Sequence, residues 1–85
     1  SGFDRDERDS ILRLKQRVEA LETEIVAREA EMSRLLKSLG KNHLSVTIVE
    51  SEIESLKQQR DRLSLEFERQ YRTLKSSGEE SKRSQ

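Results

Sequence analysis

Residues 39–49 read Leu39-Gly40-Lys41-Asn42-His43-Leu44-Ser45-Val46-Thr47-Ile48-Val49, and this stretch decides the fold. It separates two highly charged segments that share one apolar pattern. Gly40 and Asn42 are residue types common in turns and at helix ends, and residues with strand preference follow almost at once. The local chemistry therefore predicts a turn at residues 40–43 and a helical hairpin with arms of about 35 residues.

The segments on both sides of this stretch carry apolar residues at alternating spacings of three and four, which is typical of a coiled coil. With Ile11 at heptad position a, fifteen of the nineteen a and d positions are apolar. We expect these residues to form the seam of a dimer: Ile11, Leu14, Val18, Leu21, Ile25, Met32, Leu35, Leu39, Val46, Val49, Ile53, Leu56, Leu63, Phe67 and Leu74. The four polar positions are predicted to set the register: Arg28, Asn42, Arg60 and Gln70.

The heptad frame crosses residues 39–49 without a phase shift, since Leu39, Val46 and Ile53 are successive a positions. A loop has no reason to preserve this phase, whereas a continuous helix must. Gly40 falls at the outward position b, where it costs only about 1 kcal/mol relative to Ala. The preferred prediction is therefore one coiled-coil helix over residues 5–77, roughly 105 Å long, with a weak point at residues 40–49.

The direction of pairing depends on the a and d residues. Ile or Val at a with Leu at d favours two parallel strands, although this stacks Arg28 and Arg60 on their own copies. An antiparallel arrangement centred near residues 40–41 instead places Arg28 opposite Ile53. The same contacts serve a hairpin within one chain. We thus predict an all-α, two-stranded coiled coil, parallel in preference to antiparallel, with a helical hairpin turning at residues 40–43, alone or in a bundle, as the alternative.

Both ends of the chain lie outside the apolar pattern. Residues 1–4 form a polar segment in which Ser1-Gly2 look like a tag remnant. Asp4 and Glu7 have the spacing of a capping box, which places the helix start near Asp4 or Arg5. Gly78 suits a helix end, and residues 78–85 contain nothing to bury, so we expect a disordered tail there.

Composition argues against several classes of function. With 40% charged and 31% hydrophobic residues, the chain is too polar to close a globular core. The charges balance, which argues against nucleic acid and anionic membranes as partners. There is no cysteine, no second histidine beside His43 and no phosphate-binding or nucleophile motif. We therefore expect no metal, no cofactor and no enzymatic activity.

The leading hypothesis is a structural dimerisation or oligomerisation module of a larger intracellular scaffold protein, in the cytoplasm, with a second copy as its partner. Stretches such as residues 52–57 resemble many cytoskeletal, centrosomal and Golgi coiled-coil proteins. Leu44 and Ile48 stand four residues apart on the outward face, where polar residues are expected. They support the alternative hypothesis of a helical hairpin or coil that docks another protein through this pair.

Overall fold

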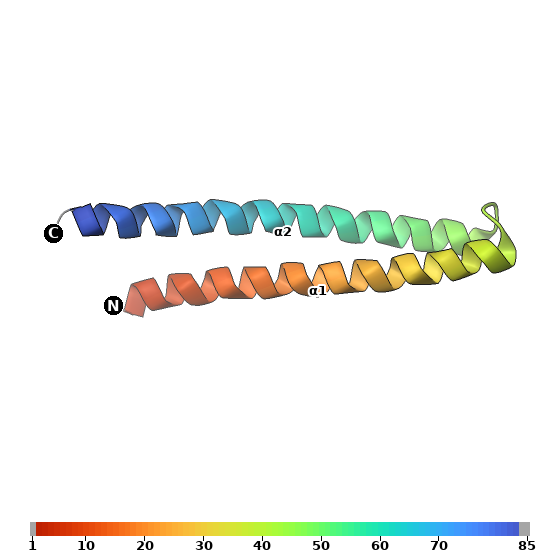
Figure 1. Ribbon diagram of the computed structural model, residues 1–85, viewed down its shortest axis with the longest axis horizontal. Helices are drawn as coiled ribbons and strands as arrows, with labels where there is room; N and C mark the ends of the chain where they lie inside the picture. The colour runs from red at the N-terminus through yellow and green to blue at the C-terminus, as the bar shows by residue number, and fades with distance from the viewer. Residues whose placement is uncertain (1, 84–85) are drawn as a thin grey trace.

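The computed structural model describes residues 2–83, with side chains from residue 5 to residue 78. It contains two long helices, α1 (Gly2–Leu39) and α2 (Leu44–Arg83). They run antiparallel and lie side by side, so that the start of α1 and the end of α2 lie towards the same end of the molecule (Figure 1). The all-α prediction and the alternative of a helical hairpin are confirmed, whereas the preferred prediction of one continuous helix is wrong for the single chain, which breaks at residues 40–43.

The break between the helices is caused by the backbone of Gly40. Its φ angle is +83°, in the left-handed region that glycine adopts without a steric penalty. The Gly40 N–H donates a hydrogen bond to the Leu36 carbonyl at 3.1 Å, which is the αL motif that ends many helices. Unbroken heptad phase did not prevent the turn, because the two arms of a hairpin can pair their a and d positions whatever the chain does between them.

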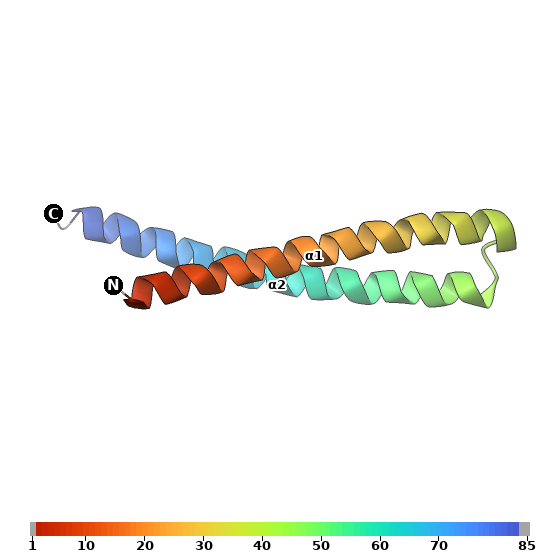
Figure 2. The same ribbon diagram turned by 90° about the horizontal axis from the view of Figure 1, so that it is seen from below.

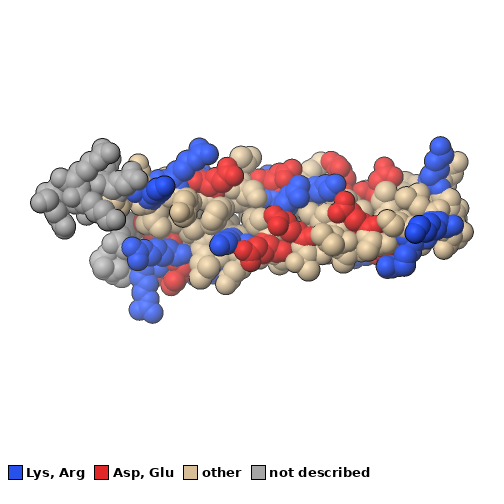
Figure 3. Space-filling view, viewed as in Figure 1, with Lys and Arg blue, Asp and Glu red and all other residues tan. Residues whose placement is uncertain are grey.

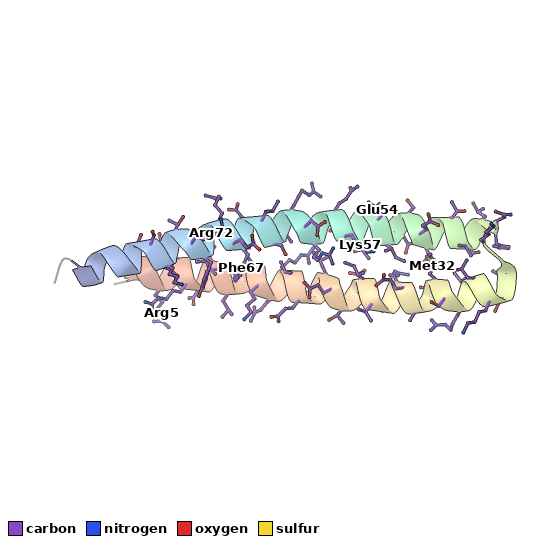
Figure 4. The ribbon with its side chains drawn as sticks, turned by 45° about the horizontal axis from the view of Figure 1, so that its top comes forward. Arg5, Met32, Glu54, Lys57, Phe67 and Arg72 are labelled. Atoms are coloured by element: carbon purple, nitrogen blue, oxygen red, sulfur yellow. The ribbon has the colours of Figure 1, made fainter. Side chains whose placement is uncertain are left out.

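The apolar seam closes within one chain. Its most buried members are Ile11, Leu21, Ile25, Val46, Val49 and Ile53, three from each helix. The other seam residues are half-buried except Leu39, which is exposed at the closed end. Figure 4 shows Met32 and Phe67 between the two helices, at separate points along the seam. Burial of apolar surface along this line is the main favourable contribution to folding.

The hairpin is long and thin, with extents of 65 × 17 × 14 Å. The helices cross at a shallow angle as they wrap around each other, which is visible in Figure 2. The chain exposes 6827 Å², although a compact protein of its mass, 10.0 kDa, exposes only about 5,200 Å². A pair of helices therefore covers much less of its own surface than a globular domain does.

Both helices extend beyond their predicted ends. α1 begins at Gly2, two or three residues before the predicted start near Asp4 or Arg5, and so includes most of the polar segment 1–4. α2 continues through Gly78 to Arg83, so residues 78–83 are helical instead of disordered. A single glycine costs a helix only about 1 kcal/mol, and the Glu, Lys and Arg residues that follow favour helix. The predictions for residues 1, 84 and 85 lie outside the described residues.

Candidate functional site

The turn between the helices is built by backbone groups and one side chain. The His43 N–H donates to the Gly40 carbonyl at 3.3 Å, closing a four-residue turn. The His43 carbonyl accepts the first bonds of α2, from Val46 at 3.0 Å and Thr47 at 3.2 Å. Its side-chain Nδ1 accepts a hydrogen bond from the Ser45 N–H at 3.1 Å. His43 is thus the N-cap of α2, since it satisfies an amide that the helix leaves without a partner.

The capping role of His43 was not predicted. Ser, Thr, Asp and Asn are the usual N-caps, and an exposed histidine next to the seam resembles an ordinary solvated residue. The one signal in the sequence was its place directly before the apolar run that starts at Leu44. Because Nδ1 acts as an acceptor here, the cap requires an imidazole that carries no proton on that nitrogen.

Exposed apolar side chains gather near this closed end. Leu44 is 70% exposed and Ile48 is 49% exposed, and they lie one turn apart on α2. Leu39, the last residue of α1, is 45% exposed although it continues the seam. The predicted partner contact of Leu44 and Ile48 is therefore accessible, and Leu39 gives the closed end a third uncovered apolar residue.

A groove of about 490 Å³ runs between the helices next to the closed end. Four residues of α1 and four of α2 line it: Glu29, Met32, Ser33, Leu36, Glu50, Ile53, Glu54 and Lys57. Lys57 Nζ lies 3.7 Å from the Glu29 carboxylate and so bridges the two helices. Figure 4 shows Met32 on α1 and Lys57 with Glu54 on α2 along this part of the hairpin. The groove combines apolar residues with mainly acidic ones.

Arg28 is the predicted polar layer that does join the helices. Its Nη1 lies 3.2 Å from Glu31 on α1 and 3.3 Å from Glu52 on α2. The Glu52 Oε2 atom is buried and, among the described residues, has the ion pair but no hydrogen bond of good geometry. Both side chains of the interhelical pair are about two-fifths exposed, so solvent weakens their attraction, and the pair aligns the helices more than it stabilises them.

The other three predicted layers do not bridge the helices within the described hairpin. Arg60 pairs with its neighbour Asp61 at 2.9 Å. Gln70 donates a hydrogen bond at 2.7 Å to Glu66, also on α2. Asn42 lies exposed in the turn, so the hairpin has no buried amide layer at this position. The register of the hairpin therefore rests on its short turn, its apolar layers and Arg28.

The open end of the hairpin has its own groove and an aromatic pair. A smaller groove of about 220 Å³ lies there, with Ile11 on α1 and Leu74 on α2 among its lining residues. Phe67 and Tyr71 stack on the same helix, with ring centroids 5.9 Å apart and planes 22° apart. Hydrogen bonds from Arg69 and then Gln70 lower the pKa of the half-buried Glu66 carboxyl, and Glu66 raises the pKa of Arg69.

The exposed surface mixes both charges. Figure 3 shows acidic and basic side chains interspersed along one face of the hairpin. Within the part of the chain that the structure describes, no three His, Cys, Asp or Glu side chains are grouped as a metal site would require. Neither described helix has an apolar stretch long enough to cross a membrane. No family model, curated protein or solved structure matches the chain.

Proposed function

We propose that this chain is a structural self-association module of a scaffold protein, and that its partner is a second copy of the same chain. The observation that supports this proposal most strongly is the shortage of buried surface. Six of the described side chains are well buried in a chain of 85 residues, and the exposed area exceeds that of a compact protein of equal mass by roughly 1,600 Å². Helices that bury so little of their own surface gain stability when they associate with other helices.

The chemistry of the surface supports a protein partner. Eight large apolar side chains of the described residues are exposed: Leu12, Val26, Leu36, Leu39, Leu44, Ile48, Leu65 and Tyr71. Charges of both signs lie between them, and the chain has no net charge, so two copies do not repel each other. Apolar contacts framed by mixed charges are typical of interfaces between coiled-coil helices.

Sedimentation equilibrium over a range from micromolar to millimolar chain tests the proposal. We expect the average mass to rise with concentration from the 10.0 kDa of one chain towards twice that value. Measurement in high salt serves as a control, because apolar association persists when surface charges are screened. A mass that stays at that of one chain over the whole range contradicts the proposal.

A second candidate function is docking of a different protein at Leu44 and Ile48, which is favoured by their exposure at the closed end. Leu44→Ala with Ile48→Ala tests it. If the pair serves docking, the variant keeps the wild-type oligomeric state and loses a partner that the wild type binds. A matched control is Leu12→Ala with Leu65→Ala, since these two leucines are also exposed but lie elsewhere. A changed oligomeric state in the Leu44 and Ile48 variant refutes docking as the role of the pair.

A further inference from the structure

The heptad frame continues through the turn although the chain reverses there. Leu35, Leu39, Asn42 and Val46 occupy d, a, d and a in one uninterrupted frame. If residues 40–43 were helical, these four side chains would line one stripe of a single helix. A closed hairpin does not require this agreement between its arms. The pattern is therefore left unexplained by the hairpin alone.

We propose that residues 40–43 are a hinge, and that two copies open there and exchange their α2 helices. Each opened chain is then one continuous helix, and the dimer is an antiparallel rod in which α1 of each copy pairs with α2 of the other. This inference rests on the proposed self-association and gives it a geometry that reuses the seam, while the exposed apolar side chains outside the turn stay uncovered. Exchange of identical elements is a low-cost route to a dimer, because it uses contacts that the monomer already makes.

The contacts between the arms support the exchange. In the hairpin, Arg28 lies beside Glu52 and Glu29 beside Lys57, as expected if the two arms pair around a centre close to residues 40–43. In the exchanged dimer the same centre becomes a two-fold axis. Both ion pairs and all apolar layers then form again between the two copies, with the same neighbours. Only the closed end of the hairpin changes.

At the closed end, each state gains something that the other lacks. The hairpin keeps the Gly40 αL bond and the His43 cap, but leaves Leu39 and Asn42 exposed. The rod loses both caps, adds helical hydrogen bonds over residues 40–43 and brings Leu39 opposite the partner's Asn42. Because the linked arms meet at an effective concentration in the millimolar range, dilute chain stays closed and concentrated chain exchanges.

Substitution of Gly40 shifts this balance in a predictable direction. Alanine is strained at the φ angle of +83° and is the best residue for a helix, so Gly40→Ala disfavours the hairpin and favours the rod. This change in free energy between hairpin and rod applies to each of the two chains in the dimer. We expect Gly40→Ala to tighten dimerisation by about 1,000-fold. No steric clash with the rest of the chain complicates the result, since no described atom beyond Gly40 and its two chain neighbours lies within 4 Å of the place that the alanine methyl group would take.

Lys41→Pro is the opposite change. The φ angle of Lys41 is not positive, and among the described residues its N–H donates no backbone hydrogen bond, so proline there removes no backbone hydrogen bond from the turn. Proline inside the continuous helix of the rod is strongly unfavourable. We expect Lys41→Pro to keep the helix content of the monomer and to weaken dimerisation by at least about 100-fold.

A distance measurement within one chain tests the hinge directly. Gln16→Cys and Arg62→Cys place two spin labels on exposed positions of this cysteine-free chain, and dilution with unlabelled chain leaves only pairs within one chain. The labels lie within about 30 Å of each other in a hairpin and about 69 Å apart in an opened helix. We expect the short distance in the monomer and the long one in the isolated dimer, for the wild type and for Gly40→Ala.

The outcomes separate the two proposals. A dimer that keeps only the short distance overturns the hinge and leaves self-association intact. Failure of both the wild type and Gly40→Ala to dimerise at any concentration overturns both. Lys41→Pro provides an independent check, because a variant that dimerises as tightly as the wild type also contradicts exchange through an opened hinge.

Discussion

Leu21→Ala tests the apolar seam at one of its best covered positions. Leu21 is 3% exposed and lies near the middle of α1, away from both ends of the hairpin. Removal of a buried leucine side chain costs about 2–5 kcal/mol, the sum of lost burial and the cavity that remains. A chain of 85 residues has a free energy of unfolding of about 4–13 kcal/mol, and a two-helix protein belongs near the low end. Leu21→Ala therefore removes about half of the stability or more.

The matched control is Leu12→Ala, the same chemical change on the same helix. Leu12 is 51% exposed, so its truncation is expected to change the free energy of unfolding by no more than about 0.5 kcal/mol. Urea unfolding followed by circular dichroism at equal chain concentration gives both values. If Leu12→Ala destabilises as much as Leu21→Ala, the apolar seam does not hold the helices together, and the reasoning is refuted.

Three further predictions concern polar groups. His43→Ala removes the cap of α2 and is expected to lower the free energy of urea unfolding by about 1 kcal/mol. His43→Asp keeps a hydrogen-bond acceptor and is expected to lower it little. Equal losses of stability in the two variants would argue against a capping role. Arg28→Leu places an apolar residue at a seam position and should raise the free energy of unfolding by about 1 kcal/mol. A clear decrease of this free energy in the same assay would contradict the prediction. The lowered pKa of Glu66 means that its small contribution to stability is present above the ordinary glutamate range and is lost as the pH falls through the lowered value. A side-chain NMR titration should show the pKa of Glu66 rise in Arg69→Ala, and an unchanged value would remove Arg69 as the cause of the shift.

Much of the fold could be predicted from apolar spacing alone. The seam residues could be identified because apolar side chains that must be buried recur every 3.5 residues on average. This pattern is the same whichever helix buries them. The choice between rod and hairpin could not be made from this period, because both bury the same layers. For the single chain it depended on the backbone of Gly40, where local turn chemistry favoured the hairpin and heptad phase favoured the rod.

The candidate site was less predictable. Leu44 and Ile48 were expected at the surface and lie there, yet the groove lined by Met32 and Lys57 depends on the antiparallel register and had no signal of its own. Asn42 was expected in a buried layer that exists only if the helix continues. The conformation of residues 40–43 thus determines whether Asn42 is buried or exposed.

The most direct test of the hairpin is amide hydrogen exchange at residues 40–43, measured by NMR at a concentration where the chain is monomeric. The N–H groups of Lys41 and Asn42 donate no backbone hydrogen bond within the described hairpin, whereas that of Ile25 lies in the middle of α1. The hairpin predicts rapid exchange at Lys41 and Asn42 and strong protection at Ile25 in the monomer. Protection of Lys41 and Asn42 equal to that of Ile25 in the monomer would contradict it.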